Sequence, residues 1–133
     1  MAAHATATFQ IENWDESEIL ETEGGSKVTH AKVSKSFEGD LEGEGTVEWL
    51  MGYDDSGSAT FVGLERISGK IGDKAGTFVL QHIGTFDGKT AKAQLQIVPG
   101  SGTGDLRGLE GEGSFEAGMG EEGERSVTLD YDV

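Results

Sequence analysis

The sequence predicts an all-β protein, a small antiparallel β-barrel of roughly eight strands with minimal helix. Short segments rich in Val, Ile, Phe and Thr alternate apolar and polar residues along most of the 133-residue chain. Gly- and Asp-rich turns separate these segments, and closure into a barrel would remove the exposed edges that such strands leave. A chain of this length is expected to form one domain over residues 1–133.

The positions of the strands follow from the alternating segments and the turns between them. The expected strands cover residues 3–11, 27–38, 44–54, 58–71, 75–86, 90–98, 110–117 and 124–132. Turn signals lie at residues 54–57, 72–74, 87–88 and 120–123. Residues 13–23 are acidic and precede two glycines, so we expect a loop there, with room for one 3₁₀ turn.

Composition excludes several classes of function. Twenty-five acidic residues against ten basic residues give a formal net charge of -15, which disfavours nucleic acid and anionic membranes as partners. The absence of cysteine excludes disulfides, thiolate nucleophiles and Cys-ligated zinc. With three dispersed histidines, no metal or other cofactor is expected. The sequence shows no secretory signal and no apolar segment long enough to span a bilayer, so we expect a cytoplasmic protein.

Five strings in the chain are distinctive. They are VEWLMGY (47–53), FVGLER (61–66), TFVLQHIGTF (77–86), VPGSGTGDLRGLEGEGSF (98–115) and LDYDV (129–133). Together they resemble a family of small bacterial domains of unknown function, similar in fold to the allene oxide cyclase barrel that plant dirigent proteins share. The resemblance implies a barrel of roughly eight strands but no settled activity, because fold does not fix function. Allene oxide cyclases and dirigent proteins steer reactive intermediates, yet no motif here matches the catalytic residues of those enzymes.

Pairing through tight turns predicts which residues face the interior. Two-residue turns at 87–88, 73–74 and 56–57 place Glu48, Glu65 and His82 in one row across three neighbouring strands. The inner face around this row would hold Leu50, Phe61, Phe78, Leu80 and Leu95. Two carboxylates and an imidazole in a dry lumen could perform general acid/base chemistry on a small apolar substrate. The alternative is a fully paired polar network inside a filled core.

The opposite face of these strands is too apolar for a solvated surface. It would carry Trp49, Met51, Tyr53, Val62, Leu64, Arg66, Val79, Gln81 and Ile83. A register error of one residue, or a bulge, would make this face the lumen, with Arg66 and Gln81 as its polar groups. Otherwise the face packs against the 13–25 loop or a partner subunit. Trp, Tyr and Arg are typical of interfaces, so we expect a homo-oligomer.

These observations leave three functions open. The barrel could be an isomerase, cyclase or product-steering protein that holds an apolar small molecule, with Glu48, Glu65 and His82 as catalytic residues. It could instead be a non-catalytic carrier, or a structural or interaction domain. The candidate binding residues are Trp49, Tyr53, Phe61, Arg66, Phe78, Leu80, Gln81 and Leu95. A cavity of about 300 Å³ or more would favour binding, whereas a solid interior would favour a structural role.

Overall fold

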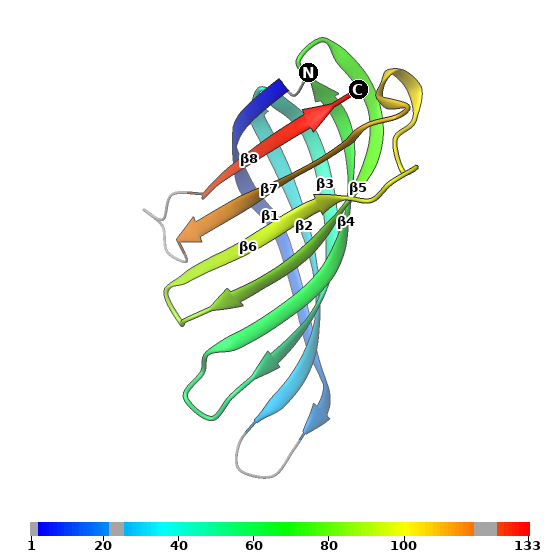
Figure 1. Cartoon of the computed structure of the whole chain (residues 1–133). Coiled ribbons are helices and arrows are strands. Elements are labelled where there is room, and N and C mark those ends of the chain that lie inside the picture. The colour runs from blue at the N-terminus through cyan, green and yellow to red at the C-terminus, as the bar shows by residue number, and fades with distance from the viewer. Residues whose placement is uncertain (1–2, 22–25, 119–124) are drawn as a thin grey trace.

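The computed structural model describes residues 3–21, 26–118 and 125–133, which form eight antiparallel strands closed into one barrel. The strands are β1 (Ala3–Glu21), β2 (Lys27–Gly39), β3 (Leu41–Tyr53), β4 (Ala59–Ile71), β5 (Lys74–Phe86), β6 (Thr90–Ile97), β7 (Glu110–Gly118) and β8 (Arg125–Asp132). Each strand pairs with the next in sequence, and β8 pairs with β1 (Figure 1). The predicted fold class is confirmed. The turn expected at residues 120–123 lies outside the described residues.

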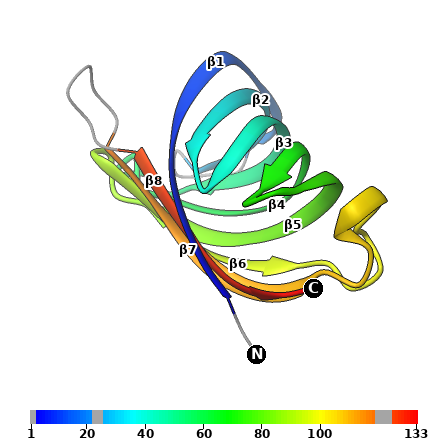
Figure 2. The same ribbon diagram turned by 90° about the horizontal axis from the view of Figure 1, so that it is seen from above.

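Side chains that point into the barrel form one core. In β2, Ala31, Val33 and Phe37 are buried while the residues between them are partly or fully exposed, except for Lys35, which shares the inner face. Figure 2, seen from above, shows the strands wrapped around this interior. The helical part of the described chain is the 3₁₀ helix η2 (Gly104–Leu106), and none of the described helix is long enough to cross a membrane.

Residues 13–21 continue β1 and correct the expected loop. They pair with β2, and register shifts occur between Ile11 and Asn13 and between Glu18 and Leu20. The first shift inserts one extra residue, so the inward-facing series passes from odd positions to Trp14 and other even positions. This change of parity interrupts the period of two in the sequence, which is why the segment does not read as a strand.

Two hairpins have different registers from those expected but keep the expected faces. Between β5 and β6, Phe86 pairs with Ala91, and between β4 and β5, Ile71 pairs with Lys74. Each register differs by two residues from the one that a turn at 87–88 or 73–74 would give. Because side chains alternate with a period of two, an even shift leaves the same residues inside.

The β3–β4 turn has an odd length and therefore exchanges the faces of β3. Asp54 Oδ1 accepts hydrogen bonds from the Ser56 N–H at 2.9 Å and the Ser58 N–H at 3.1 Å. These bonds hold a five-residue turn that pairs Tyr53 with Ala59. Relative to the expected two-residue turn, β3 is displaced by one position against β4, and every side chain of β3 changes face.

The two ends of the barrel are built differently. Near the chain termini, the segment 98–109 lies beside the first half of β5, where the Thr103 N–H donates to the Thr77 carbonyl at 2.9 Å (Figure 1). This segment buries Leu106 and Leu109 in the core, 0% and 1% exposed. Gly104 in this segment has a φ of +61°, a backbone conformation that favours glycine. The opposite end holds the β3–β4 and β5–β6 hairpins.

Candidate functional site

The predicted row of Glu48, Glu65 and His82 is formed in part. Glu65 and His82 are buried, 1% and 0% exposed, and His82 Nε2 lies 2.9 Å from Glu65 Oε1. Glu48 points outward instead, with its Oε1 3.1 Å from His30 Nε2 at the surface. The odd length of the β3–β4 turn is the physical reason. The inward placement expected for Glu48 is therefore corrected.

The exchange of faces also moves the neighbours of Glu48. Trp49 and Met51 point inward, 5% and 4% exposed, whereas Leu50 is on the outside and 47% exposed. On β4 and β5 the expected faces hold, so Arg66 and Gln81 are exposed and do not face the lumen. The remaining binding candidates are buried inside or half-buried at the barrel end: Tyr53, Phe61, Phe78, Leu80 and Leu95.

Lys35 belongs to the same buried network and was not recognised in the sequence. Its Nζ lies 3.5 Å from Glu65 Oε2, and both side chains are 2% exposed. The ammonium also lies 4.5, 4.9 and 5.1 Å from the ring centroids of Phe9, Phe115 and Trp49. Three aromatic faces and one carboxylate thus take the place of water around this charge.

Hydrogen bonding determines the protonation state of His82. The Trp49 Nε1–H can only donate, and it lies 3.3 Å from His82 Nδ1, so Nδ1 is an acceptor. The proton of a neutral imidazole is then on Nε2, which donates to Glu65 Oε1. Burial, together with the charge of Lys35, lowers the pKa of His82 more than the hydrogen bond and charge of Glu65 raise it, in agreement with a neutral ring.

Lys35 and Glu65 form an ion pair of zero net charge. Burial raises the pKa of Glu65, but the positive charge of Lys35 and the hydrogen bond from His82 outweigh that effect and lower it overall. Burial lowers the pKa of Lys35, and the charge of Glu65 opposes this change. Together with the neutral His82, the network holds one charge of each sign in a site closed to solvent.

Two inward-facing glycines, which have no side chain, make room for the side chains of this network. Gly63 pairs with Trp49 on one side and with His82 on the other, and a Cβ there would lie 2.6 Å from Trp49 Cδ1. A Cβ at Gly45 would lie 2.6 Å from Glu65 Oε2. Both positions therefore exclude a side chain so that large polar groups can meet across the strand between them.

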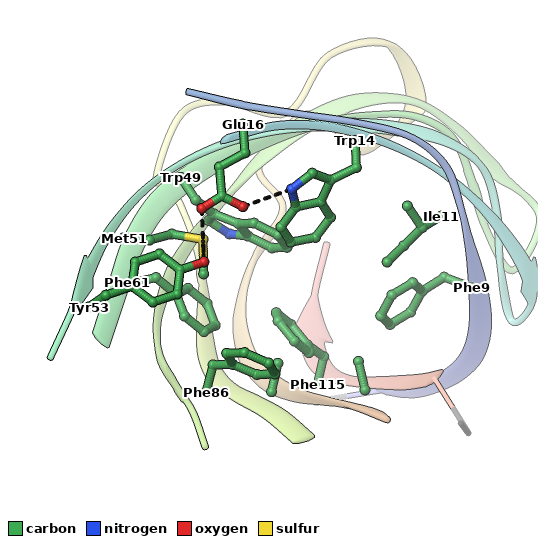
Figure 3. Close-up of a pocket in the computed structure, with 12 residues that line it drawn as sticks. Phe9, Ile11, Trp14, Glu16, Trp49, Met51, Tyr53, Phe61, Phe86 and Phe115 are labelled. Atoms are coloured by element: carbon green, nitrogen blue, oxygen red, sulfur yellow. Dashed lines mark hydrogen bonds between the residues drawn. The ribbon is translucent and has the colours of Figure 1, made fainter. Parts of the chain in front are cut away.

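A cavity of about 220 Å³ occupies the hairpin end of the lumen (Figure 3). Its lining consists of Phe9, Ile11, Trp14, Glu16, Trp49, Met51, Tyr53, Phe61, Phe86, Ala91, Phe115 and Ala117. Phe61 and the other five buried members form its floor, while the six partly exposed members, including Trp14 and Phe86, form its rim. The cavity therefore reaches solvent along this rim.

Aromatic rings dominate the wall of the cavity. Seven of the twelve lining residues are Phe, Trp or Tyr. The ring centroids of Trp49 lie 5.5 Å from Trp14 and 5.2 Å from Phe61, and Phe61 stacks on Phe115 at 6.2 Å. Phe9, Trp49 and Phe115 also contact Lys35, so these three rings separate the buried ion pair from the cavity.

Glu16 is the charged residue in this lining and was missed in the sequence. Its Oε1 accepts a hydrogen bond from Trp14 Nε1 at 2.9 Å, and its Oε2 accepts one from Tyr53 OH at 2.8 Å (Figure 3). Oε2 also accepts a hydrogen bond from Thr29 Oγ1 at 2.7 Å. Burial raises the pKa of Glu16, but these bonds and the charge of Lys27 outweigh it, so the pKa is lowered. Burial, then the bond to Glu16 and its charge, raise the pKa of Tyr53 to about 12.

Comparison with known proteins assigns this architecture to a family. The sequence matches the family model described as "Protein of unknown function (DUF3224)" over residues 5–131. The chain belongs to the DUF3224 family. A solved structure of a DUF3224 protein of unknown function from Shewanella oneidensis MR-1 is similar, with 28% identity and a TM-score of 0.78. The match covers 99% of this chain and 98% of that one. No curated protein matches the sequence. The expected resemblance to a family of unknown function is confirmed.

The interior of this DUF3224 barrel is neither solid nor large. Its cavity is below the roughly 300–1,000 Å³ of drug-sized ligand sites, yet above the roughly 150 Å³ of an apolar protein cavity that holds benzene. Glu16 and Tyr53 can act on a molecule inside it by hydrogen bonding or charge, since both line the wall. Glu65 and His82 lie behind the aromatic floor. Among the described residues, no group of three His, Asp or Glu side chains is placed to hold a metal ion.

Proposed function

We propose that this DUF3224 barrel binds a small apolar molecule, of the size of one or two rings, in its aromatic cavity. The observation that carries the proposal is a wall with seven aromatic residues around about 220 Å³ that reaches solvent at its rim. Ligand sites in proteins are typically apolar clefts with a few placed polar groups. Glu16, Tyr53 and Trp14 are those groups here, and they orient the ligand at the rim.

The proposal favours holding and orienting a ligand over acid/base catalysis by the buried pair. Glu65 and His82 act on the cavity through Trp49, whose indole N–H is held by His82 Nδ1 at 3.3 Å. They are therefore positioning residues in this proposal. A relationship to allene oxide cyclase and dirigent barrels is part of the same proposal, supported by the closed eight-stranded barrel and its apolar cavity.

Intrinsic fluorescence tests ligand binding at this site. The chain has two tryptophans, Trp14 and Trp49, and both line the cavity. Bromobenzene quenches indole fluorescence on contact, so titration should give saturable quenching in the wild-type protein. Ala117→Leu adds volume inside the cavity and should weaken binding at least tenfold, or about 1.4 kcal/mol. Ala75→Leu adds the same volume at an exposed position and should bind like wild type.

Two results would contradict the binding proposal. Quenching that rises linearly with bromobenzene and never saturates would mean collision at the surface. Equal saturable binding in wild type and Ala117→Leu would mean a site outside the cavity. Thermal melts of the three proteins, measured in parallel, show whether the added leucine has disrupted the barrel.

We also propose that the protein self-associates through the outer face of β3, β4 and β5. Leu50 pairs with Val62 and Val62 with Ile83, and these side chains are 47%, 46% and 54% exposed, with Leu64 beside them at 55%. A contiguous apolar patch of this kind is typical of interfaces. Two copies with a charge of -15 each repel one another least where the face is uncharged. Gln81 extends the uncharged area on one side of Leu64, whereas Glu48 on its other side and Arg66 mark the edge of that area.

Sedimentation velocity over a range of protein concentrations tests self-association. The wild-type chain should form a dimer or larger assembly, more readily at high salt because salt screens the net charge. Val62→Glu places a charge at the centre of the patch and should give a monomer. Gln10→Glu, exposed on β1, adds the same charge elsewhere and should still associate. A wild-type monomer at every concentration would end this proposal.

A further inference from the structure

We propose that the ligand of the cavity is cationic at one end, a small aromatic or alkyl ammonium ion whose charge lies against Glu16. This inference rests on the proposed function, because it names the chemical class of the molecule that the cavity holds. It is carried by the surroundings of one carboxylate: Glu16 lines a cavity whose other lining residues are uncharged, and its own hydrogen-bond donors are neutral.

The negative charge of Glu16 is hydrogen-bonded but not neutralised. Trp14, Thr29 and Tyr53 donate three hydrogen bonds, which satisfy oxygen lone pairs without supplying a countercharge. In the part of the chain that the structure describes, no basic side chain lies within 4.0 Å of its carboxylate. Lys27 acts from farther away, with its Nζ 5.2 Å from the centroid of the Tyr53 ring. An opposite charge brought by a ligand would therefore gain an ion pair in a partly desolvated site.

The rings around Glu16 favour the same ligand class. Trp14 and Tyr53 donate hydrogen bonds to Glu16, and both rings line the cavity with Trp49 near Trp14 at 5.5 Å. The faces of aromatic rings attract cations, and aromatic walls are the usual site for alkylated ammonium groups. An anionic ligand would instead meet the charge of Glu16 and a chain of net charge -15.

The floor of the cavity fixes which end of the ligand is charged. Phe9, Phe115 and Trp49 already hold the ammonium of Lys35 at 4.5, 4.9 and 5.1 Å. A second cation at the floor would be repelled by Lys35, whereas the rim offers Glu16. The apolar body of the ligand therefore lies on the floor, and its ammonium group lies at the rim.

Two molecules of the same shape test the inference in the wild-type protein. Phenyltrimethylammonium and tert-butylbenzene differ in one atom, so the comparison isolates the charge. Binding is followed by the fluorescence of Trp14 and Trp49 and by calorimetry. We expect the cation to bind about tenfold tighter than the neutral molecule, the range of a partly desolvated cation–π and ion-pair contact.

Glu16→Gln is the variant that locates the effect. It should bring the two affinities within about twofold of each other, since the carboxyl charge is removed while the shape of the wall is kept. Glu12→Gln removes one negative charge from the exposed side of the same strand and should keep the full preference for the cation. The two variants have the same net charge, so general attraction by the acidic protein affects them equally.

Each outcome separates this inference from the proposed function. A preference for the cation that Glu16→Gln abolishes supports the inference. Equal binding of both molecules, or tighter binding of tert-butylbenzene, overturns it and leaves the cavity as a site for neutral apolar ligands. A preference for the cation that survives in Glu16→Gln also overturns it, because the positive charge of the ligand then does not depend on the Glu16 carboxylate. If neither molecule binds, the proposed function fails as well.

Discussion

Two carboxylates inside the same barrel, Glu65 and Glu16, have opposite surroundings. Glu65 is 1% exposed, faces the ammonium of Lys35 at 3.5 Å and accepts a hydrogen bond from neutral His82. Glu16 is half-buried at the rim, and the three donors that bind it, Tyr53 among them, are uncharged. Glu65 therefore has a countercharge within 4.0 Å, whereas among the described residues Glu16 has only the more distant Lys27.

This contrast follows the two ends of the lumen. Beyond Glu65, toward the chain termini, the segment 98–109 packs Leu106 and Leu109 into the core, so side chains fill this end of the lumen. Around Glu16 the barrel is filled only as far as the aromatic floor, and a cavity of about 220 Å³ remains. We therefore expect the buried pair of Lys35 and Glu65 to act in the structure of the barrel, and Glu16 to act in the proposed ligand site.

Removing Lys35 should produce the largest effect and test whether Glu65 is a structural charge. Lys35→Met leaves Glu65, whose side chain is 2% exposed, with a buried carboxylate and no countercharge. We expect the free energy of unfolding to fall by about 3–5 kcal/mol, the usual cost of breaking a buried pair on one side. Urea denaturation followed by circular dichroism measures this change.

A double variant separates the loss of a countercharge from the loss of packing. Lys35→Met with Glu65→Gln removes both charges and keeps an acceptor for the His82 N–H, so most of the stability should return. If Lys35→Met alone costs less than about 1 kcal/mol, the pair is not the structural charge that the comparison requires.

The sequence contained the signal for Lys35 but not for its role. Residues 31, 33, 35 and 37 alternate with polar residues, and three of the four are apolar, so the period of two places Lys35 inside. Its partner could not be found in the same way, because the contact between β2 and β4 passes over Gly45 of the strand between them. Period and turn signals gave the fold and the inward faces of β4 and β5, whereas contacts across strands depend on packing.

His82 should give an intermediate effect that depends on pH. Its folded-state pKa is lowered from 6.5 by burial, so the unfolded chain binds the extra proton first as pH falls. The stability that neutral His82 contributes is complete above about pH 6.5 and is lost as pH falls toward its folded pKa, with a slope of at most about 1.4 kcal/mol per pH unit. A protonated ring would also turn an N–H toward the Trp49 N–H, so the hydrogen bond at 3.3 Å is lost.

His82→Gln isolates this titration from the other acidic groups. The amide can donate to Glu65 and accept from Trp49, yet it does not take up a proton in this range. Urea denaturation between pH 7 and pH 5 should therefore show a steeper loss of stability in wild type than in the variant. Glu65, whose pKa is lowered from 4.5, contributes its own loss at lower pH in both proteins. Parallel curves would mean that His82 is not held neutral by the network.

Other parts of the site were beyond the reach of sequence patterns for definable reasons. A two-residue turn at 56–57 predicts that Glu48 points inward, but the hydrogen bonds of Asp54 make that turn longer by an odd number of residues. The acidity of residues 13–23 and the two glycines after them indicate a loop at Glu16, and the bulge after Ile11 hides the strand because it moves the inward series to even positions. In both cases the inward-facing residues change between odd and even positions at a bulge or a turn, and an alternating sequence does not show where such a change occurs.

Removing the charge of Glu16 at the rim should have a smaller effect, which is seen in the titration of Tyr53. The pKa of Tyr53 is raised to about 12 by burial first and then by the hydrogen bond to Glu16 and its charge. Glu16→Gln removes the charge but not the burial, so the pKa of Tyr53 should fall below 12 and stay above its ordinary 10.0. The expected change in the free energy of unfolding at neutral pH is within about 1 kcal/mol, because the rim is partly exposed.

Tyr53 and Tyr131 are the two tyrosines of the chain, so tyrosinate absorbance is measured in a Tyr131→Phe background, with circular dichroism recorded on the same samples. Glu12→Gln in that background should keep the pKa near 12; if Glu16→Gln does too, then Glu16 does not hold an uncompensated charge beside Tyr53.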